Sequence, residues 1–231
     1  MQTGCTPTRL KPWINTMLKL STYFRSTAAY RVRIALNIKG LKHTLIPVHL
    51  LRDGGEHKTP EFLNKNPDGL IPTLDVDNRV LAQSMAIIEY LEETYPEKPL
   101  LPAESTLRAY IRGLTQTVSC DIHPLNNLRV LKFLVNEMGI SEQQKALWYQ
   151  HWIAEGFSSL ETRLATNDHT GLCCVGDTPT MADCCLIPQV YNAIRFGCPL
   201  DNYPTIQRIN TYCLSLDAFD TSRPENQFDA E

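Results

Sequence analysis

"YFRSTAAYRVRIALNIKG", residues 23–40, joins the end of one expected strand to a helix that stops at a glycine. The strand is expected over residues 18–23, and Gly40 suits a helix end because glycine adopts the left-handed conformation without steric cost. Ser26 and Thr27 lie at the helix start, where a hydroxyl can accept hydrogen bonds from free backbone amides. The same amides and the helix dipole favour a bound anion. The pair is therefore interpreted either as a helix cap or as a site for an anion such as a thiolate.

Strands and helices continue to alternate as far as residue 95. The expected elements are a strand at 43–50, a short helix from Pro60 to about Lys65, a hairpin at 71–82 that turns at Asp77 and Asn78, and a helix that Ser84 caps and Pro96 stops. The order predicts a parallel strand pair with a right-handed crossover, extended by an antiparallel hairpin.

Beyond residue 95 the chain reads as a proline-rich linker followed by helices. The expected helices cover about 104–119, 124–138, 142–166, 180–196 and 204–216. Pro124 is expected in the first turn of its helix and Gly139 at the end, and "TMAD" at 180–183 is a capping box. The predicted domains are a disordered extension at 1–16, an α/β domain at 17–96, a linker at 97–103 and an all-helical domain at 104–231, with Met17 as a plausible start of the protein.

Composition restricts the function further. The chain has 231 residues, 43% of them apolar and 20% charged, with a net charge of −3. It has no basic run that favours nucleic acid, no apolar run of the ~18 residues that span a membrane, and no apolar centre of a signal peptide at its start. The eight cysteines have neither C-x-x-C spacing nor paired histidines, so we expect no metal site. They are interpreted as small buried residues in a reducing, cytoplasmic environment.

A second group of candidates follows in the α/β domain. Pro72 precedes a strand, and a cis Ile71–Pro72 bond would turn the backbone of Ile71 outward to pair with an extended peptide. Gln83 and Ser84 form another helix start. Two anion-compatible helix starts in one small domain suit a ligand with a thiolate at one end and a carboxylate at the other.

Polar candidates also lie beyond the linker. "CDIHPLNNLRVL" at 120–131 holds His123, Asn127 and Arg129, although a single histidine is usually structural. Arg195 lies near the end of an apolar helix, and Arg25 precedes the Ser-Thr pair. Each arginine can be a solvated head on an apolar stem, but two beside a thiol site would suit a dicarboxylate substrate.

These stretches resemble the zeta-class glutathione transferases, the family that includes maleylacetoacetate isomerase. The matching segments are "YFRSTAAYRVRIALNIKG", "HLLRDGGEH", "NPDGLIPTL", "QSMAIIEYLEETYP", "CDIHPLNNLRVL", "GDTPTMADCCLIPQVYNAIRF" and "YPTI". The resemblance implies the glutathione transferase fold: a thioredoxin-like N-terminal domain followed by an all-α C-terminal domain. It further implies a homodimer and glutathione as cofactor. The implied activity is glutathione-dependent cis–trans isomerisation of maleylacetoacetate to fumarylacetoacetate, in tyrosine and phenylalanine catabolism. Isomerisation of maleylpyruvate, transfer of glutathione to α-halo acids and a non-catalytic binding role stay open as alternatives.

The resemblance also implies roles for individual residues. Ser26, followed by Thr27, would hydrogen-bond the glutathione sulfur, and Arg25 and Arg195 would bind the substrate carboxylates. The further implied glutathione contacts are Arg31, His57, Ile71, Pro72, Gln83, Ser84, His123, Asn127 and Arg129. Many zeta-class chains read Ser-Ser-Cys where this one reads Ser26-Thr27-Ala28, so an enzyme thiol is not expected to take part.

Overall fold

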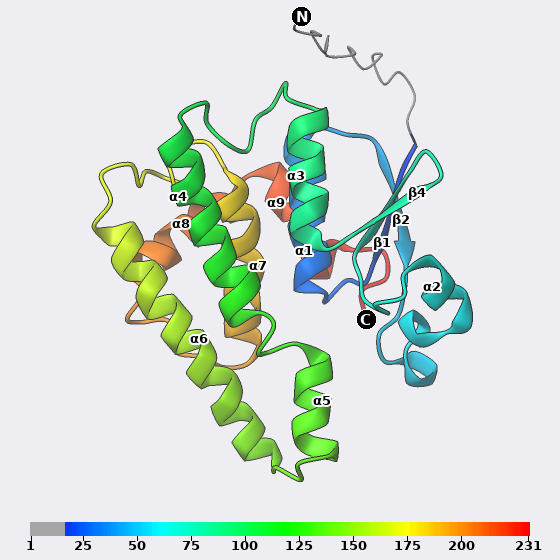
Figure 1. The fold of residues 1–231 in the computed structure, drawn as a ribbon. Coiled ribbons are helices and arrows are strands. Elements are labelled where there is room, and N and C mark those ends of the chain that lie inside the picture. The colour runs from blue at the N-terminus through cyan, green and yellow to red at the C-terminus, as the bar shows by residue number, and fades with distance from the viewer. Residues whose placement is uncertain (1–16) are drawn as a thin grey trace, which may run out of the picture.

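A computed structural model describes residues 17–231, and the expected extension at 1–16 lies outside the described residues. The N-terminal part contains a four-stranded sheet in the order β2-β1-β3-β4 (Figure 1). Strands β1 (Leu18–Thr22) and β2 (His43–Pro47) are parallel. Strand β3 (Thr73–Val76) runs antiparallel to β1 and pairs with β4 (Arg79–Ala82). The predicted parallel pair and antiparallel hairpin are confirmed.

Three α-helices belong to this sheet layer. Helices α1 (Thr27–Lys39) and α3 (Ser84–Thr94) lie side by side on the sheet face toward the helical part, and α2 (Pro60–Lys65) lies on the other side (Figure 1). Two 3₁₀ turns, Arg52–Gly54 and Glu56–Lys58, precede α2. The second strand is shorter than predicted because the chain leaves the sheet after Pro47 toward these turns. Asp77 and Asn78 have φ of 45° and 65°, as the turn of a two-residue hairpin requires.

The remainder of the chain is helical. Its α-helices are α4 (Ser105–Gln116), α5 (Leu128–Asn136), α6 (Glu142–Ala165), α7 (Met181–Arg195), α8 (Pro204–Leu214) and α9 (Asp217–Asp220). A π-helical segment, Thr117–Ile122, extends α4, and a 3₁₀ turn, Pro224–Asn226, follows α9. The capping box of Thr180 and Asp183 begins α7 as predicted. No helix within residues 17–231 is both long and apolar enough to cross a membrane.

Two expected helix starts are wrong. Helix α5 begins at Leu128, with the side chain of Asn127 accepting a hydrogen bond from the amide of Arg129 at 3.1 Å. Pro124 therefore lies before the helix, in the turns at 123–126 that follow the π-helical segment, and Gly139 lies just after the turn beyond Asn136. In α3, Ser84 is the first helical residue and Gln83 occupies the cap position without a side-chain cap bond.

The two parts of the chain share one core. Helix α1 packs against the sheet layer on one side and against α7 on the other (Figure 1). The buried Arg33 guanidinium donates to Thr22 Oγ1 at 2.9 Å, to the Phe24 carbonyl at 3.1 Å and to the Ser222 carbonyl at 3.1 Å. These bonds fix the loop after β1, which carries the first site residues, against the C-terminal segment.

The linker is also anchored. Buried Glu92 on α3 accepts from Lys39 Nζ at 2.8 Å and from the backbone amides of Leu100 and Leu101 at 2.9 and 3.0 Å. The carboxylate thus joins α1, α3 and the linker, and it holds the helical part in place over the sheet layer.

Candidate active site

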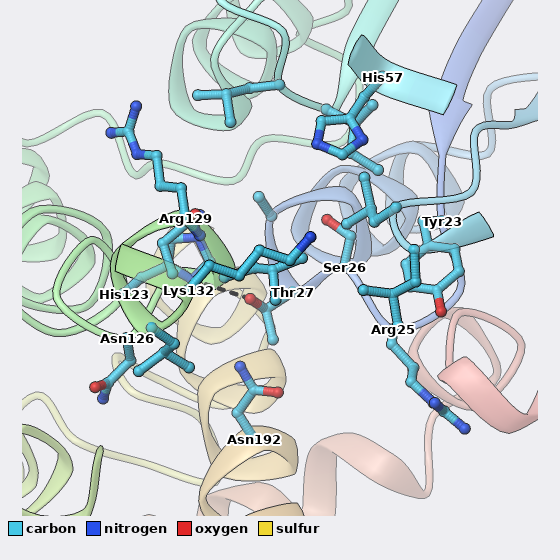
Figure 2. A pocket seen from close by; sticks show the side chains of 18 of the residues that line it. Tyr23, Arg25, Ser26, Thr27, His57, His123, Asn126, Arg129, Lys132 and Asn192 are labelled. Atoms are coloured by element: carbon cyan, nitrogen blue, oxygen red, sulfur yellow. Dashed lines mark hydrogen bonds between the residues drawn. The ribbon is translucent and has the colours of Figure 1, made fainter. Parts of the chain in front are cut away.

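A pocket of about 260 Å³ opens between the sheet layer and the helical part (Figure 2). Its walls are the start of α1, the two 3₁₀ turns, the loop before β3, the start of α5 and the end of α7. A smaller pocket of about 130 Å³ adjoins it, and Ile71, His123 and Asn127 line both. The two pockets form a continuous groove past the start of α1, which suits an extended ligand.

Ser26 forms the floor of the larger pocket at the start of α1. Its Oγ accepts a hydrogen bond from the Ala29 amide at 3.2 Å, so Ser26 is the helix cap that the sequence predicts. A hydroxyl that accepts this bond keeps its own hydrogen for a ligand in the pocket. Capping and anion binding are therefore compatible at this residue.

Thr27 connects the two parts of the chain beneath the pocket. Its buried hydroxyl lies 3.0 Å from Nδ1 of His123, which follows the π-helical segment (dashed in Figure 2). Burial, together with the positive charges of Arg31 and Arg129, lowers the pKa of His123 to about 3. His123 is therefore neutral near pH 7 and acts here as a hydrogen-bonding group, not as a cation.

The smaller pocket contains the second helix start. The Ile71–Pro72 peptide bond is cis, and Pro72, Gln83, Ser84 and Arg129 line this pocket. Gln83 has a φ of 70°, an uncommon conformation for a residue other than glycine. Such conformations concentrate at ligand sites, where the surrounding structure maintains them.

Arg31 lies behind this pocket and lines neither pocket. It is 2% exposed, and its Nη1 donates to the Ser84 hydroxyl at 3.3 Å. Its Nε and Nη2 find no hydrogen-bond partner among the described residues, and burial lowers its pKa. A buried, incompletely paired guanidinium behind Ser84 adds positive potential to a pocket that already suits an anion.

Arg25 and Arg195 lie in the wall of the larger pocket, one from each part of the chain. Arg25 lies 4.6 Å from the ring centre of Phe24, and Arg195 lies 5.1 Å from that of Phe196. Burial raises the pKa of Tyr23, and the charges of both arginines act to lower it. The structure thus brings the two arginines to one end of the pocket, as the substrate hypothesis requires.

Within the described chain, five cationic side chains and no acidic ones line the larger pocket. They are Arg25, Lys58, Arg129, Lys132 and Arg195. This local excess contrasts with the net charge of −3 for the whole chain. Sequence reasoning missed Lys58 and Lys132, although Lys132 lies three residues after Arg129 and thus on the same helix face.

The cysteines do not contribute to these pockets. Six of the seven described cysteines are buried, Cys120 is exposed, and none of the seven lines either pocket; Cys5 lies outside the described residues. The interpretation as small buried residues is confirmed for those six, and Cys120 is the exception.

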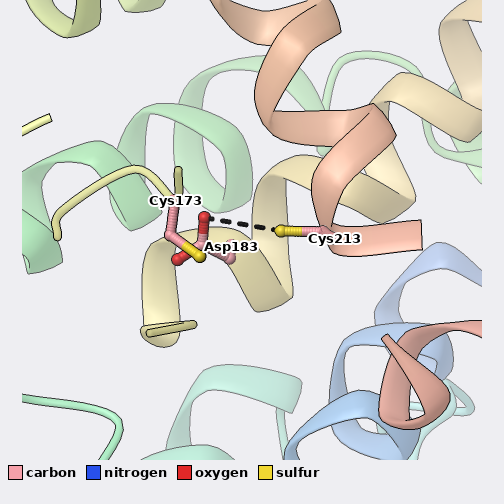
Figure 3. Close-up of side chains that lie close together, drawn as sticks. All are labelled: Cys173, Asp183 and Cys213. Carbon is pink, nitrogen blue, oxygen red and sulfur yellow. Dashed lines mark hydrogen bonds between the residues drawn. The ribbon is translucent and has the colours of Figure 1, made fainter. Parts of the chain in front are cut away.

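Within residues 17–231, one group of side chains has metal-ligand chemistry: Cys173, Asp183 and Cys213 (Figure 3). Asp183 Oδ1 accepts from the Cys174 amide at 2.8 Å, and Oδ2 accepts from the Thr180 amide at 2.7 Å. Because Oδ2 completes the start of α7 and Oδ1 holds the preceding loop and accepts from the Cys213 thiol at 3.9 Å, this buried group is structural.

Comparison with known proteins agrees with this fold. Residues 25–94 match the family model "Glutathione S-transferase, N-terminal domain". The structure "Holo structure of Maleyl Pyruvate Isomerase, a bacterial glutathione-s-transferase in Zeta class" aligns with a TM-score of 0.90 at 44% identity, covering 92% of this chain and all (100%) of that one. The fold is that of a glutathione transferase.

Two further relatives show which family of glutathione transferases the chain belongs to. A "Probable maleylacetoacetate isomerase" from Vibrio cholerae is 48% identical over 92% of this chain and 98% of its own length. A maleylacetoacetate isomerase from Anaeromyxobacter dehalogenans, solved "with bound dicarboxyethyl glutathione and citrate in the active site", aligns with a TM-score of 0.84 at 37% identity over 96% of this chain and 97% of that one. The chain belongs to the maleylacetoacetate isomerase family of zeta-class glutathione transferases.

Proposed function

We propose that the protein is a glutathione-dependent cis–trans isomerase that converts maleylacetoacetate to fumarylacetoacetate. The observation that carries the proposal is the larger pocket, where a serine hydroxyl at a helix start faces five cations and no acid. Glutathione as a thiolate and a diacid substrate are both anionic, so one pocket of this charge can hold them together.

The groove provides a place for each part of glutathione. Ser26 donates a hydrogen bond to the sulfur, and the backbone of Ile71 pairs with the tripeptide. Gln83 and Ser84 hold the γ-glutamyl carboxylate in the smaller pocket, with the charge of Arg31 behind them. In this arrangement residues 17–96 form the glutathione-binding domain and residues 104–231 the substrate domain.

The reaction requires temporary loss of a double bond. When bound, glutathione supplies a thiol that adds reversibly to the conjugated double bond of the substrate and so permits rotation about it. Ser26 lowers the thiol pKa by hydrogen-bonding its ionised form. Arg25 and Arg195 receive the substrate carboxylates and stabilise charge that moves toward oxygen during the addition. Binding both reactants in one pocket fixes their orientation.

Solved structures of relatives support the proposed isomerase function and leave one alternative substrate. The Anaeromyxobacter relative holds glutathione joined to a dicarboxylic group together with a second polycarboxylate, and this chemistry matches the pocket. Maleylpyruvate is the alternative substrate, because the structure that aligns at a TM-score of 0.90 is named for it. The proposal includes a homodimer in the cytoplasm, carried over from the family resemblance.

The test is Ser26→Ala, with Ser215→Ala, an exposed serine at the C-cap of α8, as control. Charge-assisted hydrogen bonds contribute about 1.5–3 kcal/mol, so the pKa of bound glutathione should rise by about 1–2 units in Ser26→Ala alone. Thiolate absorbance measures this pKa, and turnover of both diacids is assayed with and without glutathione. Turnover that persists without glutathione would refute the proposed function.

A further inference from the structure

The five cations of the larger pocket divide into groups at different places. Arg25 and Arg195 both act on the ionisation of Tyr23. Burial lowers the pKa of His57, and the charges of Lys58 and Lys132 lower it further. Lys58 directly follows His57 in the chain, and in Figure 2 the ammonium of Lys132 lies on the side of Ser26, whereas the Arg25 guanidinium points away from it.

Lys132 reaches this place from the helical part. It lies on α5, one turn after Leu128, and both residues line the larger pocket. In Figure 2 its ammonium group points into the cavity on the side of Ser26 and Thr27. Lys58, by contrast, donates a hydrogen bond to the Gly69 carbonyl at 3.2 Å. Lys132 makes no hydrogen bond or ion pair with any described residue, so its charge is available to a ligand.

We propose that Lys132 binds the glycyl carboxylate of glutathione across the cleft, from helix α5 in the helical part of the chain. This inference rests on the proposed function and its placement of glutathione. With the γ-glutamyl end in the smaller pocket and the sulfur at Ser26, the glycyl residue continues beyond the sulfur into the larger pocket. There it meets His57, whose pKa is lowered by burial, so the positive charge comes from Lys132. Arg129 also lines the smaller pocket, and its guanidinium points away from Ser26 in Figure 2.

The placement has a structural consequence. Glutathione would then contact both parts of the chain: the sheet layer through Ser26, Ile71 and Ser84, and α5 through Lys132. The arginine pair stays available for the diacid, so cofactor and substrate do not compete for the same cations. The pocket thus provides separate charges for the carboxylates that the reaction brings together.

The experiment compares Lys132→Met with Lys42→Met, which replaces an exposed lysine outside both pockets. The ligands are S-methylglutathione and its glycyl ethyl ester, and calorimetry measures their affinities without turnover. An ion pair at a partly exposed site should contribute about 2- to 5-fold in affinity. Lys132→Met should weaken S-methylglutathione binding by this factor, whereas the ester, which lacks the carboxylate charge, should bind equally to all three proteins.

Two results would overturn the inference. One is an equal loss for the acid and the ester, which would show a packing effect instead of a charge effect. The other is unchanged S-methylglutathione affinity with a raised KM for the diacid, which would assign Lys132 to the substrate. If wild-type protein binds S-methylglutathione but isomerises neither diacid, the proposed function is refuted and the inference about Lys132 is not. If wild-type protein isomerises the diacid but Lys132→Met leaves S-methylglutathione affinity unchanged, this inference is refuted and the proposed function is not.

Discussion

Lowering the pH from 7 to 5 should destabilise this protein through His123. The imidazole has a pKa of about 3 in the folded protein, against 6.5 as its ordinary value. Between these values the unfolded chain takes up a proton that the folded protein refuses, so stability falls as the pH falls. Because pH 5 lies well above 3, the folded imidazole stays neutral, and the uptake by the unfolded chain sets the size of the effect. It amounts to about 2 kcal/mol at pH 5 relative to pH 7.

The assay is urea unfolding at pH 7, 6 and 5 for wild type, His123→Gln and His169→Gln. His123→Gln should be less stable than wild type at pH 7, because the bond to Thr27 is altered. Its stability should decrease less than that of wild type when the pH is lowered to 5. The stability difference between wild type and His123→Gln should therefore shrink by about 2 kcal/mol between pH 7 and pH 5. The contribution of His57, which has the same sign, cancels in this difference. His169 is exposed, and its replacement should leave the wild-type slope unchanged.

An equal loss of unfolding free energy between pH 7 and pH 5 in wild type and His123→Gln would refute the reasoning. It would mean that His123 accepts a proton in the folded protein about as readily as in the unfolded chain. The contact between Thr27 and His123 would then be made by a charged imidazole.

Three other changes test separate parts of the structure. Arg25→Met or Arg195→Met should lower kcat/KM for the diacid by about 10- to 100-fold and leave glutathione affinity unchanged; a parallel loss of glutathione binding would move these residues to the cofactor site. Replacement of all eight cysteines by alanine or serine should leave an active enzyme with a lower melting temperature, because no described cysteine lines the pockets; loss of turnover in the folded variant would contradict this. Glu92→Gln should cost about 3–5 kcal/mol in urea unfolding, because buried Lys39 loses its counter-charge; a loss below 1 kcal/mol would show that water replaces it.

Local signals in the sequence predicted much of the fold. Ser26, Thr180 and Gly40 mark helix ends through their own backbone and side-chain chemistry, and the structure places helix ends at each. In α6, apolar residues at helical spacing predict one core face, and all five are at most 2% exposed: Tyr149, Ile153, Phe157, Leu160 and Leu164. These features depend only on neighbours within one or two helical turns.

The missed features depend on contacts between distant segments. The start of α5 follows a π-helical segment that has no sequence signature, so the position of Pro124 was misleading. The family resemblance implies Arg31 as a glutathione contact, but only the packing of α1 against α3 shows that it lies behind Ser84. In the sequence, Lys58 and Lys132 cannot be distinguished from ordinary surface lysines. Only the packing of the two parts of the chain places them in one pocket.

Helix α1 contributes no exposed residue to the surface of the described chain, and this has a consequence for how the protein unfolds. If the helical part leaves, Arg33 loses its bond to the Ser222 carbonyl, and the apolar face of α1 that packs against α7 meets water. The sheet layer is thus not an independent folding unit. The whole chain should melt in a single cooperative transition, and residues 17–96 alone should remain unstructured in solution.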